Sequence, residues 1–234
     1  MVEQAASSQS IVEVLGHRLR DDIINGRLLP GQQLVEADLV DTYQVSRNSI
    51  REVLHQLVRD GLATSIRHRG VFVRTFCEND LADIYTARRV VQLQAIRCDG
   101  AYCPKHLDKI GQNIERAQLA LQSHQWKEVG TLSLAFHQVL VQALGSRLIT
   151  EFFLNICAQL RLIFTIGPNE RIVQRPLWVE WEHLIHRLMC EGAREQAEQE
   201  LCHYLSASQE ALSKVVRKYQ PQRRAIPARA LNEG

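Results

Sequence analysis

The sequence lacks the features that would place the chain in or across a membrane. It contains no apolar run of about 18 residues, so we predict no segment that spans a bilayer and no membrane partner. Residues 1–10 do not combine a basic stretch with an apolar core, so we expect no secretory signal and a cytoplasmic protein. A large excess of one charge sign is also missing, because 28 Lys+Arg stand against 26 Asp+Glu. Any basic surface for nucleic acid must therefore be local.

Aromatic residues and closely paired cysteines are scarce as well. With 6% aromatic, 45% hydrophobic and 23% charged residues, the composition excludes a collagen-like fibre, a membrane channel and a wholly disordered chain. None of the six cysteines forms a Cys-x-x-Cys pair, and their spacings indicate neither a disulfide framework nor a zinc ribbon. We therefore expect buried, reduced thiols.

Lysine is absent before Lys105, so all nine basic residues of the first 76 are arginine. Residues 1–43 carry three Arg against seven acidic residues, whereas residues 44–74 carry six Arg against two. The charge therefore changes sign within one small segment, which is typical of a module with a binding face.

Apolar periodicity predicts three helices in this segment, at residues 8–25, 36–43 and 47–60. Ser46 is a suitable N-cap for the third helix. Two β-type runs, 62–66 and 71–74, flank a hairpin tip at 67–70. This order of elements is typical of a winged helix-turn-helix, which we assign to residues 1–76.

The third helix directs its polar face away from its apolar stripe. The N-terminal end of a recognition helix enters the major groove, where Arg pairs with guanine and Asn with adenine. Basic residues at the hairpin tip suit the minor groove or phosphates. The predicted DNA contacts are Ser46, Arg47, Asn48, Ser49, Arg51, Arg67, His68 and Arg69. The alternative is an ordinary solvated basic face.

Residues 19–73 resemble the winged helix of the GntR superfamily. The matching marks are Gly26-Arg27, Pro30-Gly31, Val45-Ser46-Arg47, Arg51-Glu52, Leu54, Gly61-Leu62 and Arg69-Gly70. The resemblance implies that Arg47, Asn48, Ser49, Arg51 and Arg69 read DNA. Ala37 is a departure, because members often carry a basic residue there, and one DNA contact is therefore in doubt.

The rest of the chain is predicted to be helical. Six helices with short connections indicate an antiparallel bundle over residues 77–218, with a cap at Glu78 or Asn79 for the first. The fold class is therefore mainly α. Residues 219–234, with two prolines and three arginines, are predicted to form a flexible basic tail.

This half resembles the FadR-like branch of the superfamily, with its FCD-type ligand domain. The marks are Arg88-Arg89, Phe136-His137, Glu182-His183 and His203-Tyr204-Leu205. The resemblance implies a homodimer that binds a small-molecule effector. It also implies that Arg88 points into the bundle, where a guanidinium could clamp a carboxylate; the alternative is a surface or interface salt bridge.

Many members hold a divalent metal such as zinc with one Asp and three His, but here Ser133 occupies the Asp position. His137, His183 and His203 are the candidate metal ligands. The family spacing of 22 between the last two positions instead selects Glu182 and Tyr204. Three alternatives stay open: a metal, a metal-free polar pocket that binds an organic ligand, or histidines without a ligand role. The candidate effector residues are Arg88, Ser133, His137, Glu182, His183, His203 and Tyr204.

These patterns together predict a ligand-responsive transcription regulator, most simply a repressor, that binds a palindromic operator as a dimer. Its effector is expected to be a small organic acid or a related metabolite. One alternative is a constitutive DNA-binding protein whose bundle serves only dimerisation. A metal-dependent enzyme fused to a DNA module is a weaker alternative, because no nucleophile–base pair is evident.

Overall fold

The computed structural model describes residues 11–166 and 176–219 of the 234-residue chain. Two compact units divide between Thr75 and Phe76, one residue before the predicted domain boundary. The predicted helix start at Ser8 and residues 220–234 of the predicted tail lie outside the described residues. Within the described part, no helix is long and apolar enough to cross a membrane.

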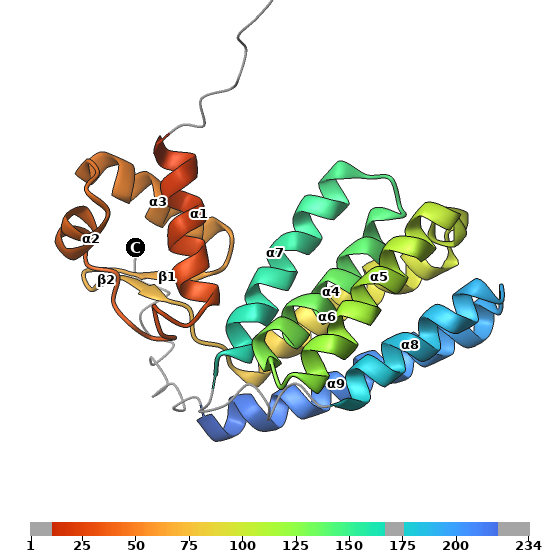
Figure 1. The fold of residues 1–234 in the computed structure, drawn as a ribbon. Helices are drawn as coiled ribbons and strands as arrows, with labels where there is room; N and C mark the ends of the chain where they lie inside the picture. Colours follow the sequence, from red (N-terminus) through yellow and green to blue (C-terminus); the bar gives the residue numbers. More distant parts are fainter. Residues whose placement is uncertain (1–10, 167–175, 220–234) are drawn as a thin grey trace, which may run out of the picture. The chain divides into compact units, whose positions relative to one another are not determined.

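The first unit is a winged helix, as predicted (Figure 1). Its elements are α1 (Ile11–Ile24), α2 (Glu36–Tyr43), α3 (Arg47–Arg59), β1 (Ala63–Ile66) and β2 (Gly70–Val73). The two strands pair antiparallel, with Ala63 opposite Val73 and Ile66 opposite Gly70. Leu62 and Arg74 were predicted as strand residues but lie outside the strands, so the paired part of the hairpin begins at Ala63 and ends at Val73.

The core of the first unit lies where α1 packs against α3. Leu15, Leu19 and Ile23 of α1 are buried at four-residue intervals. The apolar stripe of α3 is buried as well: Ile50, Val53, Leu54 and Leu57. Ile11, four residues before Leu15, is 67% exposed, because it is the first residue of α1. Burial of the α3 stripe leaves the polar face of that helix toward solvent.

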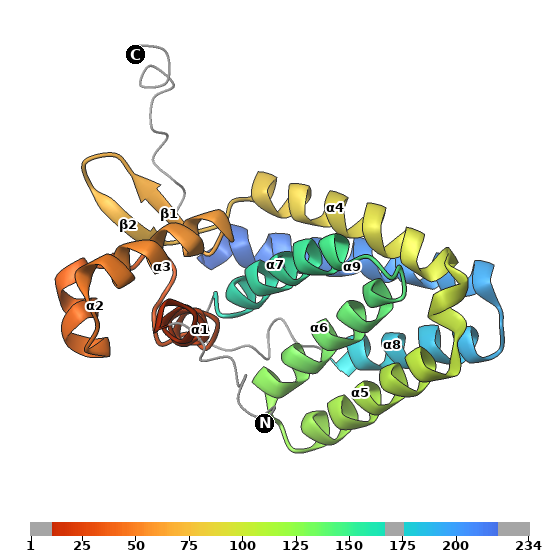
Figure 2. The same ribbon diagram turned by 90° about the horizontal axis from the view of Figure 1, so that it is seen from above.

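The second unit is helical throughout its described part, which confirms the mainly α fold class. Its elements are α4 (Glu78–Arg97), the short 3-10 helix η1 (Asp99–Tyr102), α5 (Pro104–Gln122), α6 (Trp126–Gln142), α7 (Arg147–Phe164), α8 (Pro176–Cys190) and α9 (Arg194–Tyr219). Helix α4 packs along α9, α5 along α6, and α8 along α9 (Figure 2). Gly145 and Gly192, with φ of 68° and 72°, follow α6 and α8 at the turns into the next helix.

Two local predictions for the second unit were wrong. The N-cap of α4 is Cys77 rather than Glu78 or Asn79, and the Asp80 carboxylate accepts a hydrogen bond from the Cys77 backbone N–H at 2.8 Å. All six cysteines are free, as expected, but only Cys157 is buried. Cys77 and Cys103 occupy N-cap positions, and helix ends tend to lie near the surface.

Candidate functional site

The exposed N-terminal end of α3 is the first candidate site. The Ser46 Oγ accepts a hydrogen bond from the Ser49 backbone N–H at 3.1 Å, which confirms the predicted cap. Arg47 and Asn48 follow directly and are exposed. The helix therefore begins with an exposed basic side chain and an exposed amide, beside backbone N–H groups that favour phosphate.

Arg51 of α3 has a partner that sequence reasoning missed. Its Nε lies 3.0 and 2.9 Å from the two carboxylate oxygens of Glu36, the first residue of α2. Both side chains are partly exposed. Arg51 therefore sits in an ion pair on the same face as Arg47, and a base or phosphate would have to compete with Glu36 for it.

The wing presents Arg67, His68 and Arg69, all exposed, at its tip. His68 adopts a left-handed backbone with φ of 59°, and the Arg69 N–H donates to the Ile66 carbonyl at 2.9 Å. Gln33 supports the turn, because its Nε2 donates to the Arg69 carbonyl at 3.0 Å. The predicted tip residues therefore project from a braced turn.

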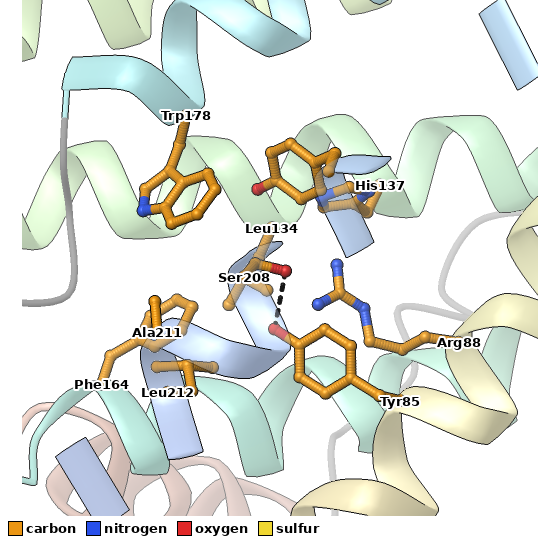
Figure 3. Close-up of a pocket in the computed structure, with 10 residues that line it drawn as sticks. Tyr85, Arg88, Leu134, His137, Phe164, Trp178, Ser208, Ala211 and Leu212 are labelled. Carbon is orange, nitrogen blue, oxygen red and sulfur yellow. Dashed lines mark hydrogen bonds between the residues drawn. The ribbon is translucent and has the colours of Figure 1, made fainter. Parts of the chain in front are cut away.

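A small cavity inside the bundle is the second candidate site (Figure 3). Its lining comes from α4, α6, α7, α8 and α9: Tyr85, Arg88, Leu134, His137, Phe164, Trp178, Tyr204, Ser208, Ala211 and Leu212. It has room for about one or two water molecules with the side chains as they stand. The candidate effector residues predicted from the sequence include Arg88, His137 and Tyr204 from this lining, but neither the polar residues Tyr85 and Ser208 nor the apolar members.

Arg88 is the charged group of the cavity. The side chain is 3% exposed, and its guanidinium lies over the Tyr85 ring at 4.7 Å from the ring centre. No carboxylate of the described residues lies within ion-pairing distance of Arg88, and its buried Nε has no hydrogen-bond partner there. Figure 3 shows the guanidinium pointing toward the space between Tyr85, Ser208 and His137. The geometry thus agrees with an inward-pointing Arg88 rather than a surface salt bridge.

Ser208 is a buried polar residue on a largely apolar face of α9. Its Oγ accepts a hydrogen bond from the Tyr85 hydroxyl at 2.9 Å, inside the bundle. Leu201, Leu205 and Leu212 on the same face of α9 are buried as well. Ser208 thus holds the Tyr85 ring on which Arg88 rests, and a serine among these leucines was a sequence signal for the cavity.

Three buried side chains from α6, α8 and α9 form a hydrogen-bonded cluster beside the cavity. The Ser133 and Tyr204 hydroxyls both donate to Glu182 Oε1, the latter at 3.1 Å. Glu182 Oε2 is buried without a partner among the described residues. Burial raises the pKa of Glu182 to about 7, against the opposing effect of the two hydroxyls, and raises the pKa of Tyr204 well above its ordinary value.

His137 packs against Tyr204 of this cluster and lines the cavity together with Arg88. Its ring centre is 4.9 Å from that of Tyr204, and neither ring nitrogen has a hydrogen-bond partner among the described residues. Burial, and secondarily the Arg88 charge, lowers the pKa of His137 well below its usual range. The imidazole is therefore neutral and offers one donor and one acceptor.

His183 and His203 do not join His137. Both are exposed; His183 Nδ1 lies 3.1 Å from Gln118 Nε2, and His203 Nδ1 lies 3.7 Å from Glu200. The expectation that these two histidines point into the pocket is wrong, and the geometry of the two helices gives the reason. Glu182 shares the buried face of α8 with Trp178 and Ile185, and Tyr204 that of α9, whereas each histidine is one residue away. The family spacing of 22 residues between the last two ligand positions therefore selects the two residues that point inward, Glu182 and Tyr204.

The inward residues do not fit a zinc-like ion. Ser133, His137, Glu182 and Tyr204 include one imidazole and one carboxyl group, and Glu182 Oε1 already accepts two hydroxyl hydrogen bonds. Nowhere in residues 11–166 and 176–219 do three His, Cys, Asp or Glu side chains come together as a metal would require. Structural zinc takes four ligands and catalytic zinc takes three protein ligands, drawn mainly from these residue types.

Comparisons with known proteins agree with both units. Residues 11–73 match the family model described as bacterial regulatory proteins, gntR family, and residues 83–207 match the FCD domain. The crystal structure of a GntR transcriptional regulator from Rhodococcus sp. RHA1 is similar over 91% of this chain and 100% of that chain, with a TM-score of 0.79 and 29% identity.

Curated relatives are similar over shorter stretches. The HTH-type transcriptional regulator BphR of Paraburkholderia xenovorans (strain LB400) is 35% identical over 39% of this chain and 38% of that protein. The HTH-type transcriptional repressor GlaR of Escherichia coli (strain K12) is 35% identical over 34% of this chain and 36% of its own. The chain thus matches under two fifths of the length of either relative. Their names are those of regulators rather than enzymes, in line with the sequence prediction.

The two family matches follow one another in the order of the two units described above. The FCD match alone, over residues 83–207, covers more than half of the chain. The chain therefore belongs to the GntR family of bacterial regulatory proteins, with an FCD domain after its winged helix.

Proposed function

We propose that this protein is a ligand-responsive transcription regulator that acts in the cytoplasm. In this proposal a homodimer binds a palindromic operator through its winged helices and represses transcription, and an organic acid in the bundle changes its DNA affinity. The observation that carries the proposal is Arg88, which is buried without a carboxylate partner among the described residues, in a cavity of a domain that follows a DNA-binding module. The name of the relative GlaR, a repressor, favours repression over activation.

Operator binding is proposed to depend on the start of α3. Arg47 is exposed directly after the Ser46 cap, where a major-groove helix presents its side chains. A bidentate Arg–guanine contact contributes about 1–3 kcal/mol of discrimination, so Arg47→Ala should weaken operator binding by about that amount.

The experiment measures fluorescence anisotropy on a duplex selected from random sequence by the wild-type protein. Arg59→Ala is the matched control, because Arg59 is exposed in the last turn of the same helix. It removes the same charge and should change affinity much less. Equal effects of the two variants would show that Arg47 contributes only general electrostatic attraction.

The effector response is proposed to depend on Arg88. Burying an unpaired guanidinium is costly, and a bound carboxylate would relieve that cost through charge-assisted hydrogen bonds. Arg88→Met should abolish the effect of any effector on operator affinity while leaving operator binding itself intact. A constitutive DNA-binding protein, the alternative predicted from sequence, would show no ligand effect in wild type.

A further inference from the structure

The cavity presents a single positive charge to a ligand. Arg88 is buried and has no carboxylate of the described residues within ion-pairing distance. His137 is fully buried beside it and neutral. The other buried arginine of the bundle, Arg161, does not line the cavity. A ligand with one negative charge would balance Arg88, whereas a second negative charge would stay uncompensated in an apolar surrounding.

The lining offers few polar groups besides Arg88 and His137. The Ser208 hydroxyl already accepts from Tyr85 and donates to the Leu205 carbonyl at 3.3 Å. The rest of the lining is aromatic or aliphatic: Tyr85, Leu134, Phe164, Trp178, Tyr204, Ala211 and Leu212. Hydroxyl groups of a sugar acid would lose water there without gaining partners, at a cost for each unpaired group.

The side chains near the cavity that could act as metal ligands form hydrogen bonds with one another instead. Ser133 and Tyr204 both donate to Glu182, which links α6, α8 and α9 through hydrogen bonds. Among the described residues, the buried atoms without partners include Arg88 Nε, both His137 nitrogens and Glu182 Oε2, and also Nε2 and Oε1 of Gln92, one turn along α4, which does not line the cavity. Arg88 and His137 line the cavity, and both can donate to a carboxylate directly.

We propose that the cavity takes a monocarboxylic acid with an apolar remainder and binds it without a metal ion. The acid's carboxylate accepts hydrogen bonds from Arg88 and His137, and its apolar part packs against Trp178, Phe164 and Leu212. This inference rests on the proposed function, because it names the class of the effector. It excludes dicarboxylates, sugar acids and acids that bind through a chelated metal.

Isothermal titration of the intact protein in the presence of EDTA tests the proposal. The probes are acetate, propionate, benzoate and phenylacetate. They differ in size because side chains must move to admit a ligand, and the series tests how large a ligand the cavity can then accept. Malonate and phthalate add a second carboxylate, gluconate adds hydroxyls, and benzamide removes the charge. We expect at least one simple monoacid to bind, and its dicarboxylate or amide counterpart to bind about tenfold or more weakly.

Two variants tie this binding to the cavity. Arg88→Met should abolish binding, whereas Arg89→Met, one residue along α4, should not, because Arg89 Nη2 donates to Gln209 at 2.7 Å instead. Ala211→Phe fills the cavity with a larger side chain while Arg88 stays in place as the wild-type residue, and it should also abolish binding. It provides an independent test if Arg88→Met does not fold.

The outcomes separate this inference from the proposed function. Preferential binding of a dicarboxylate or sugar acid, loss of binding in EDTA, or no binding of any monoacid would overturn the inference. An Arg88-dependent dicarboxylate that changes operator affinity would still support the proposed function. A monoacid that binds as expected but leaves operator affinity unchanged would support the inference and refute ligand-responsive regulation.

Discussion

The buried carboxyl group of Glu182 makes the stability of the bundle depend on pH. Burial raises its pKa from 4.5 to about 7 in the folded protein. Because the folded pKa is the higher one, the stability linked to the proton is fully present below pH 4.5 and is lost as pH rises through about 7. One pKa unit corresponds to about 1.4 kcal/mol, so the whole effect is about 3 kcal/mol at pH 8 and under about 1 kcal/mol at pH 5.

Glu182→Gln removes this dependence. Glutamine keeps a carbonyl oxygen that can accept the hydrogen bonds of Ser133 and Tyr204, and it does not ionise. The difference in free energy of unfolding, variant minus wild type, should therefore grow by about 2–3 kcal/mol between pH 5 and pH 8. Urea denaturation followed by circular dichroism at several pH values measures it.

The comparison with wild type matters because His137 acts in the opposite direction. Its lowered pKa means that stability is lost as pH falls through the unfolded value near 6.5. That contribution is common to both proteins and cancels in the difference. Glu180→Gln, on the exposed side of α8, is the control and should follow wild type at every pH. Parallel stability curves for wild type and Glu182→Gln would refute a protonated Glu182.

Three further predictions concern the other features. Glu36→Gln frees Arg51 and removes a negative charge from the DNA face, so affinity for random duplex should rise and the ratio of operator to random binding should fall in anisotropy titrations. Elemental analysis of protein purified without chelators should find well under one equivalent of metal, and a full equivalent that His137→Ala removes would contradict the donor analysis. Leu148 and Phe152, one turn apart on α7 and 74% and 51% exposed, are candidates for the dimer contact. Light scattering of Leu148→Glu/Phe152→Glu should show a monomer; an unchanged dimer would place the interface elsewhere.

Helix and strand positions could be predicted because they depend on neighbours in the sequence. The α3 stripe of Ile50, Val53, Leu54 and Leu57 repeats with helical periodicity, and its burial follows from that pattern alone. Ser46 satisfies a backbone N–H three residues away, so its cap role is equally local. The cap at Cys77 was missed because cysteine is an uncommon N-cap residue.

It was harder to predict which polar side chains contact one another. Nothing local in the sequence shows that Arg51 meets Glu36, fifteen positions away on another helix. The choice between His183 and Glu182 is of the same kind, because both lie on α8 and one residue of helical rotation decides which is buried. The spacing of 22 between Glu182 and Tyr204 offered the right register as one alternative.

The sequence by itself therefore determined the order of elements, the buried stripes and the exposed basic end of α3, since each follows from short-range periodicity and capping. Only the tertiary structure decided that Arg88 is buried with no carboxylate of residues 11–166 and 176–219 paired to it, and that Ser133, Glu182 and Tyr204 form hydrogen bonds with one another. Those facts depend on which faces of α4, α6, α8 and α9 meet. The meeting of these faces is set by side-chain packing across the whole bundle, which no local pattern encodes.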